Sequence, residues 1–252
     1  TPLLAVLTAL IIGGIIIQLN GVNPFAAYGQ LFKSAFYQAN PKAPFMSGLA
    51  KTLLTATPMI FAGLAVMMAF KAGLFNIGGQ GQMIMGGLAA AVVGIYVKNV
   101  LFGNFVVAII AAGIAGFLWA SIAGILKAKF GVHEVISTIM LNYIAINLQN
   151  YLLNYPIKDP ASQNVQTMKV WEPARLFLLA PGTKQKLNFG FILAIIAVII
   201  VWYFFNKTKQ GYEMTAVGLN STAAENAGIK IKRNIILAMG LAGMLAGIGG
   251  AE

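Results

Sequence analysis

The sequence predicts an all-α polytopic membrane protein, and three observations carry that prediction. Hydrophobic residues make up 59% of the 252 residues and charged residues only 9%, whereas roughly a quarter of the residues of a soluble domain are charged. Several apolar runs approach or exceed the roughly 18–20 residues that cross a bilayer. The formal net charge is +11, but the cations lie in loops and at the ends of apolar runs. Lipid headgroups account for them, so no nucleic-acid partner is expected.

At least seven transmembrane helices are expected in this sequence. The expected spans cover residues 3–19, 49–70, 83–97, 105–126, 132–153 and 189–205, with a seventh that begins near 234. Residues 20–47 are expected to connect the first two spans, and Pro58 should kink the second. The chain starts at Thr1 and stops inside the seventh span. We therefore expect a single transmembrane domain, 1–252, truncated at both ends and lacking further C-terminal spans.

The alternation of spans predicts which connections share a side of the membrane. Lys71, Lys127 and residues 207–233 fall on one side, and the long connection 154–188 falls on the other. Cations close to span ends count more for orientation than cations in long loops. Residues 207–233 are therefore predicted to be cytoplasmic, and residues 154–188 to form an extracytoplasmic loop.

The stretch Gly211–Arg233 is rich in polar and small residues and lies between two apolar spans. Thr222 and Glu225 fit a capping box, and Gly228 suits the left-handed position that ends a helix. The helix between them would have about one turn and an alanine face of Ala223, Ala224 and Ala227. Such a helix could fill a groove on another protein, and an ordinary surface loop is the alternative.

Residues 71–82 combine glycines with side-chain amides between two apolar spans. The run lacks the Lys-Ser/Thr of a phosphate-binding loop. Non-helical backbone at membrane depth must be buried in protein or line a wet cavity. A broken or re-entrant element is therefore possible, with Asn76, Gln80 and Gln82 facing a neutral solute. A tight turn with close helix packing is the alternative.

The span 132–153 is the most polar one. Thr138, Asn142 and Gln149 follow helical spacing on one face, and Tyr143 lies on the neighbouring face. Unpaired amides facing lipid would be costly, so this face should meet protein or a water-filled path. Hydrogen bonding between helices would explain it equally well.

No catalytic or metal site is expected. His133 and Glu134 form the one adjacent His/Glu pair, which lacks the second His of a zinc-protease helix and is best explained as a polar pair at a helix start. Only Glu134 and Glu252 among the acids could reach membrane depth, whereas ion-coupled carriers usually place ionisable groups there. A secondary transporter is thus the weaker alternative, and a membrane-embedded enzyme weaker still.

Two stretches, KAGLFNIGGQGQMIMGG (71–87) and GYEMTAVGLNSTAAENAGIKIKRN (211–234), resemble the permease subunits of bacterial ABC importers. This family handles branched-chain amino acids, ribose-type sugars and nucleosides, and the likeness is greatest to its nucleoside and simple-sugar branch. The run GVHEVIST (131–138) also fits that branch. One departure is Gly79-Gln80, where relatives often carry an acidic residue before Gly-Gln.

The resemblance implies a permease subunit in the bacterial inner membrane and not an enzyme. It would pair with a second permease subunit as a homo- or heterodimer, be powered by a cytoplasmic ABC ATPase and receive solute from an extracytoplasmic substrate-binding lipoprotein. ATP and Mg²⁺ would bind the ATPase, so no cofactor is expected on this chain. The implied substrates are nucleosides, ahead of ribose-type sugars or branched-chain amino acids. Residues 207–233 would couple to the ATPase, with the motif positions Gly218, Asn220, Ala223, Ala224, Glu225, Ala227 and Gly228.

Overall fold

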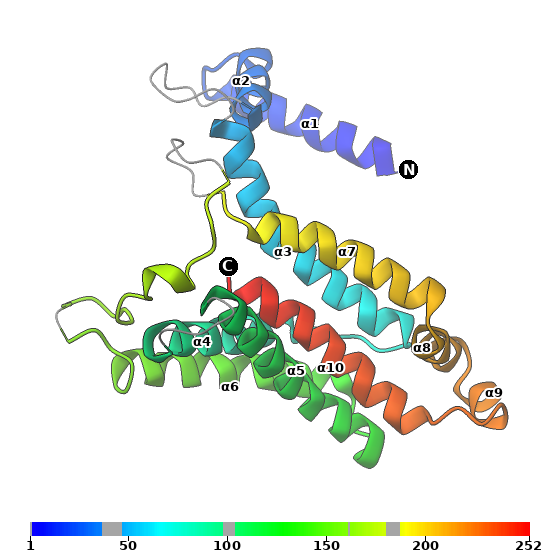
Figure 1. The fold of residues 1–252 in the computed structure, drawn as a ribbon. Helices are drawn as coiled ribbons and strands as arrows, with labels where there is room; N and C mark the ends of the chain where they lie inside the picture. Colours follow the sequence, from blue (N-terminus) through cyan, green and yellow to red (C-terminus); the bar gives the residue numbers. More distant parts are fainter. Residues whose placement is uncertain (1, 37–46, 98–103, 161, 180–186) are drawn as a thin grey trace. The chain divides into compact units, whose positions relative to one another are not determined.

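The computed structural model describes residues 2–36, 47–97, 104–160, 162–179 and 187–252 (Figure 1). These residues form ten α-helices and one short 3₁₀ helix, and no extended strand occurs among them. The prediction of an all-α protein is therefore confirmed. The elements are α1 (Pro2–Leu19), α2 (Pro24–Phe36), α3 (Ser47–Lys71), α4 (Gly79–Tyr96), α5 (Asn104–Phe130), α6 (Glu134–Asn154), η1 (Glu172–Ala174), α7 (Gly190–Lys207), α8 (Lys209–Leu219), α9 (Ser221–Asn226) and α10 (Ile231–Gly250).

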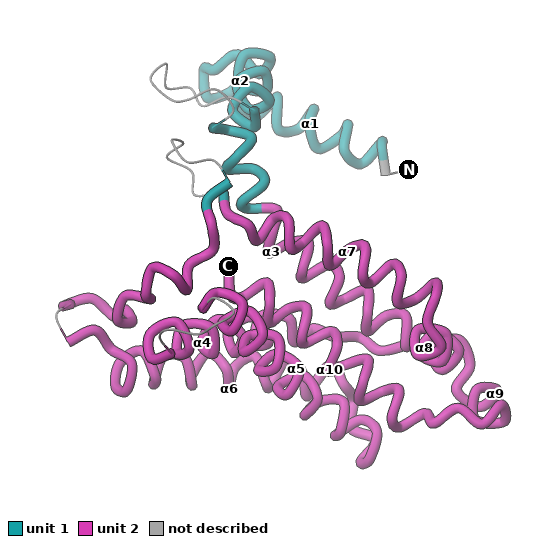
Figure 2. Tube along the Cα trace, in the orientation of Figure 1, with its two compact units in different colours: residues 1–55, 178–187 teal, residues 56–177, 188–252 magenta. Residues whose placement is uncertain are grey.

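The chain divides into two compact units, residues 1–55 with 178–187 and residues 56–177 with 188–252 (Figure 2). The first unit holds α1, α2 and the start of α3. Helix α2 was not expected within the 20–47 connection, although Pro24 occupies its first position and the Asn23 side chain accepts from the Phe25 N–H at 2.9 Å. Both features are typical helix starts. Helix α3 runs without interruption through Pro58 and into the second unit.

Four described helices are long and apolar enough to cross a bilayer, namely α3, α5, α7 and α10, and the bent pair α1 and α2 would make five. All seven expected spans correspond to helices, so the polytopic architecture is confirmed. Helices α4 and α6 do not qualify as spans by themselves. The reason is their polar content, because Gln80 and Gln82 lie in the first turn of α4 and several amides lie along α6.

Glycines set the packing of the second unit, and α5 and α10 cross antiparallel at close range. A Cβ on Gly116 would collide with the carbonyl oxygen of Gly243, and one on Gly124 would lie 3.1 Å from the Ile236 Cα. Small residues let membrane helices approach this closely. The same holds for seven glycines of α4, α5 and α10, because a Cβ added to any of them would meet atoms of a neighbouring helix: Gly86, Gly87, Gly113, Gly116, Gly240, Gly243 and Gly247.

The long connection and the 207–233 segment lie at opposite ends of α4. The Trp171 N–H, next to η1, donates to the Gly94 carbonyl near the C-terminal end of α4 at 3.0 Å. Residue Gly218 instead contacts the turn that precedes the N-terminal end of α4. This arrangement agrees with the alternation of spans, while the assignment of either side to the cytoplasm stays a prediction.

Candidate functional site

Residues 207–233, called here the coupling segment, contain two helices where the sequence predicted one. Helix α8 begins after Thr208, whose hydroxyl accepts from the Gly211 N–H at 3.1 Å. Its Met214 side chain is fully buried and Val217 is also buried. Met214 belongs to the same apolar core as Ala72 and Leu74. Helix α8 is therefore a packed element of the second unit and not a loop.

Gly218 on α8 lies backbone against backbone with the turn that ends α3. A Cβ on Gly218 would lie 2.7 Å from the Gly73 nitrogen and would collide with the Lys71 carbonyl oxygen. Gly73 itself has a φ of 72°, a conformation that other residues rarely adopt. The two glycines together allow this approach, which the sequence analysis did not foresee.

Asn234 fastens α8 to the start of α10. It is fully buried, and its Nδ2 donates to Glu213 Oε2 at 3.3 Å. Its Oδ1 accepts from Gln210 Nε2 at 2.5 Å. The signal in the sequence that could have identified this contact is the single amide at the start of an apolar helix, because a buried amide needs partners.

Helix α9 is a single turn at the tip of this structure, as expected, but its N-cap differs from the prediction. Asn220 caps it, with Oδ1 accepting from the Ala223 N–H at 3.0 Å, so the predicted Thr222–Glu225 capping box is wrong. Asn220 has an extended backbone, which places its side chain over the first turn, whereas Thr222 already lies inside the helix. The predicted stop at Gly228 is confirmed, because its φ is 79° and the next residue, Ile229, donates to the Ala224 carbonyl at 3.0 Å.

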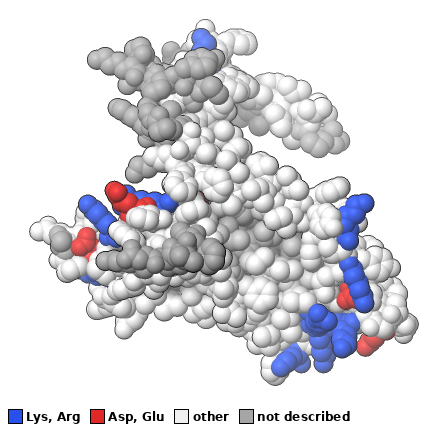
Figure 3. All heavy atoms as spheres, viewed as in Figure 1, with Lys and Arg blue, Asp and Glu red and all other residues white. Residues whose placement is uncertain are grey.

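The alanine face of α9 is divided between the inside and the outside. Ala224 is 4% exposed and packs inward, whereas Ala223 and Ala227 are exposed. Lys and Arg side chains gather at the end of the second unit that carries α8 and α9 (Figure 3). Three exposed cations, Lys230, Lys232 and Arg233, come from the chain directly after α9. The exposed part of α9 thus carries small alanine side chains and is bordered by positive charge.

Asn76 and Gln82, two of the predicted pathway residues, bond to each other in both directions. Asn76 Nδ2 donates to Gln82 Oε1 at 3.1 Å, and Gln82 Nε2 donates to Asn76 Oδ1 at 3.0 Å. The Gly78 N–H also donates to Asn76 Oδ1, at 2.9 Å. Both side chains are buried. The helical backbone is interrupted between Lys71 and Gly79, as both a broken element and a tight turn require, and whether this segment re-enters the membrane stays a prediction.

Asn142 of α6 completes this amide cluster, defined here as Asn76, Gln82 and Asn142. Its Oδ1 accepts from the Gly81 N–H at 2.8 Å, and its Nδ2 donates to the Ile77 carbonyl at 3.0 Å. Thr138 adjoins the cluster, because a Cβ on Gly78 would lie 3.1 Å from the Thr138 Cβ. Asn142, one residue of the polar face of α6, therefore hydrogen-bonds to the start of α4 and to the turn before it, and the role of the whole face stays a prediction.

Three further predicted pathway residues, Gln80, Tyr143 and Gln149, are not members of this cluster. Gln80 and Tyr143 are exposed, and Gln149 is half-buried further along α6. Within the described ranges, no hydrogen bond joins them to the amide cluster. The role of all seven residues in a solute pathway stays a prediction.

Glu134 forms an ion pair that the sequence analysis missed. Its buried carboxylate lies 2.9 Å from Lys127 Nζ at the end of α5. The interpretation of His133 and Glu134 as a polar pair at a helix start is confirmed, because His133 Nδ1 accepts from the Val135 N–H at 3.4 Å and caps α6. The ion pair between Lys127 and Glu134 therefore joins the C-terminal end of α5 to the N-terminal end of α6.

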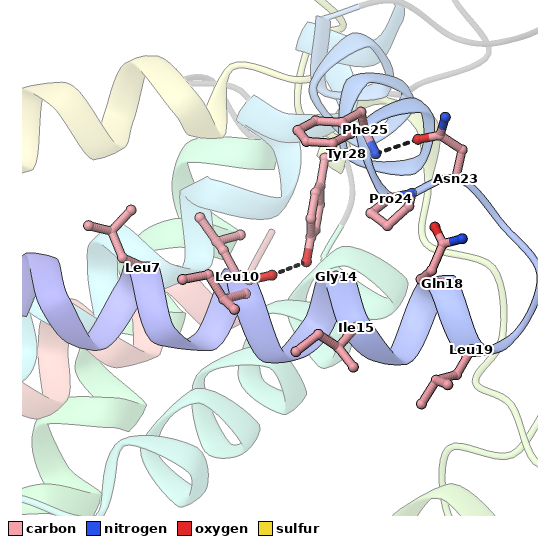
Figure 4. Close-up of a pocket in the computed structure, with 11 residues that line it drawn as sticks. Leu7, Leu10, Gly14, Ile15, Gln18, Leu19, Asn23, Pro24, Phe25 and Tyr28 are labelled. Carbon is pink, nitrogen blue, oxygen red and sulfur yellow. Dashed lines mark hydrogen bonds between the residues drawn. The ribbon is translucent and has the colours of Figure 1, made fainter.

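An apolar groove of about 720 Å³ lies in the corner between α1 and α2 (Figure 4). Aliphatic and aromatic side chains form most of its wall, including Leu7, Ile11 and Phe25. The Tyr28 hydroxyl in that wall already donates to the Leu10 carbonyl at 2.7 Å. Few groups are left to bond a polar solute, so the groove is a poorer candidate than the coupling segment and the amide cluster.

Comparisons with known proteins identify relatives of this chain. Residues 48–251 match the family model for the permease component of branched-chain amino acid transport systems. The chain is 38% identical to the guanosine ABC transporter permease protein NupP of Bacillus subtilis, covering 99% of this chain and 70% of the relative. It is 35% identical to the nucleoside ABC transporter permease protein NupB of Lactococcus lactis, over 99% of this chain and 68% of that relative.

A permease named for a sugar has about the same sequence identity to this chain. The glucose ABC transporter permease protein TsgB13 of Haloferax volcanii is 35% identical over 99% of this chain and 66% of its own length. The chain thus spans about two thirds of the length of these relatives. No solved structure matches the chain.

Proposed function

The chain belongs to the permease family of branched-chain amino acid transport systems, and from this premise we propose that it is a permease subunit of an ATP-driven importer for nucleosides. The observation that carries the nucleoside assignment is the similarity over almost the whole chain to two permeases named for guanosine and for nucleosides. Sugars are the second candidate, because the glucose permease of Haloferax volcanii is similar to the same extent.

The structure of the coupling segment supports the proposal that a separate ATPase supplies the energy for transport. Helix α9 is capped at both ends, exposes Ala223 and Ala227, and is carried by a packed helix. Such a short rigid turn with little bulk suits insertion into a groove on a cytoplasmic ABC ATPase. ATP and Mg²⁺ would bind that ATPase, and this chain would supply neither catalytic residues nor a cofactor.

Glu134, one of the two acids that could reach membrane depth, does not favour an ion-coupled carrier. Carriers of that kind use ionisable groups that gain and lose their ion during transport. Glu134 is instead held by Lys127 at 2.9 Å. A fixed ion pair between two helix ends suits a structural role, so ATP-driven transport remains the better explanation.

The remaining parts of the importer follow from the family. A second permease subunit, the same or different, would complete the path through the bacterial inner membrane, and an extracytoplasmic binding lipoprotein would deliver the solute. Of the proposed pathway residues outside the amide cluster, Gln80, Tyr143 and Gln149 are exposed or half-buried, and their polar groups suit a neutral, hydroxyl-rich solute.

Uptake of radiolabelled guanosine and uridine by a strain that lacks the gene tests this function. We expect uptake to fall and to return when the gene is restored. Unchanged nucleoside uptake together with loss of glucose uptake would favour the sugar alternative and overturn the nucleoside assignment.

A further inference from the structure

We propose that residues 73–82, called here the link segment, transmit movement of the coupling segment to the polar face of α6. Gly218 of α8 contacts the first end of this segment and Asn142 of α6 bonds to its second end, and both act as positioning residues. The inference rests on the proposed function, because it requires an ATPase that moves the coupling segment.

The first end of the link segment is fixed to α8. A Cβ on Gly73 would lie 3.0 Å from the Gly218 Cα and 3.1 Å from the Gly218 carbonyl oxygen. Next to this contact, Leu74 is buried in the core that also contains Met214 of α8. Close-packed interiors transmit displacement because they are hard to compress. A shift of α8 must therefore displace Gly73.

Helix α8 is itself held firmly enough to carry a displacement. Asn234 connects it to α10 through Glu213 and Gln210, and Figure 1 shows α8 beside the ends of α3 and α7 with α9 beyond it. A partner bound at α9 would thus act on a helix that is bonded to its neighbours and not on a loose loop.

Side-chain hydrogen bonds hold the middle of the link segment in place. The side chains of Asn76 and Gln82 bond to each other across the turn, and Asn76 Oδ1 also accepts from the Gly78 N–H. Satisfied buried polar networks hold a backbone in one arrangement. The turn should therefore move as a unit.

The far end of the link segment is fixed to α6. Asn142 bonds to the Gly81 N–H and to the Ile77 carbonyl, and a Cβ on Gly81 would lie 3.0 Å from the Asn142 Cα. Asn142 shares α6 with Tyr143 and Gln149, which are pathway residues in the proposed function. A displaced link segment would therefore rotate or shift the helix that carries them.

The assembled importer in proteoliposomes tests the inference, with the full-length permease, its partner permease, the ATPase and the binding lipoprotein. The measured quantity is guanosine transported per ATP hydrolysed. Gly218→Ala and Asn142→Ala should each lower this ratio by roughly 2- to 30-fold, leave the KM for guanosine-loaded lipoprotein unchanged, and leave the ATPase bound. Gly63→Ala is the matched control, because a Cβ there meets open space on α3.

A wild-type ratio in both variants would overturn the inference. A raised KM with an unchanged ratio would overturn it too, because the segment would then belong to the solute path. If Gly218→Ala prevents assembly, Asn142→Ala decides alone, since it leaves the packing of α8 intact. If the wild-type importer carries glucose and no guanosine, the ratio is measured with glucose, so a failed substrate assignment is distinguished from a failed link.

Discussion

Asn76 and Gln82 hydrogen-bond to each other through both atoms of each side-chain amide, at 3.1 and 3.0 Å. Side-chain amides that pair in this way leave few donors and acceptors for a passing solute. The pairing accounts for the burial of both residues in a largely apolar protein, since a buried amide without partners would be costly.

Replacement of Gln82 by Met should destabilise the protein. The variant keeps the size of the side chain but removes both hydrogen bonds and leaves Asn76 partly unsatisfied, at a cost of about 1–3 kcal/mol. Thermal unfolding of the purified protein in detergent micelles measures the loss. The matched control is Gln80→Met, two residues earlier and exposed, and equal destabilisation by both variants would contradict the assigned network.

Replacement of Lys127 by Met should also destabilise the protein, because it leaves the Glu134 carboxylate buried without its cation. Breaking a fully buried pair costs more, but the Lys127 side chain is 31% exposed, so we expect about 1–3 kcal/mol. Chemical unfolding in micelles provides the measurement. Lys129→Met is the control because Lys129 is exposed, and a loss of similar size there would show that the ion pair is not responsible.

Replacement of Asn220 by Ala should weaken the interaction with the ATPase. Loss of the cap costs a helix about 1 kcal/mol, which corresponds to roughly fivefold weaker binding if α9 must be folded to dock. Titration of purified ATPase into the permease pair gives the affinity. Asn220→Ser should retain most of the binding, and Thr222→Ala should have little effect. A larger effect of Thr222→Ala would restore the capping box that the structure contradicts.

Replacement of Ala223 by Trp should block docking by bulk at the exposed surface of α9. We expect the permease to insert normally while losing both the bound ATPase and transport. The ATPase that co-purifies with the permease measures the effect. Asn164→Trp adds the same side chain to an exposed site on the connection 154–188, and full ATPase recovery with Ala223→Trp would rule out α9 as the docking element.

Much of the fold followed from the sequence because its signals are local. The apolar runs correctly predicted seven of the helices, and Gly228 correctly predicted the end of α9. Helix α8 was missed because its apolar residues, such as Met214 and Val217, are separated by polar and small ones. They form a face only when the helix packs on the core.

The candidate site was less predictable because its contacts join distant parts of the chain. The sequence marked Asn76, Gln82, Thr138 and Asn142 as polar residues that need an explanation, and the structure brings them together. The approach of Gly73 to Gly218 and the pairing of Lys127 with Glu134 depend on how helices cross. No periodicity or motif within one segment encodes such contacts.

The most direct test of the central claim is ATP-driven uptake of radiolabelled guanosine into proteoliposomes that contain the complete importer. We predict accumulation that requires ATP, Mg²⁺ and the binding lipoprotein, and that unlabelled uridine reduces while unlabelled glucose does not. ATP-dependent accumulation of glucose with no accumulation of guanosine or uridine would contradict the account.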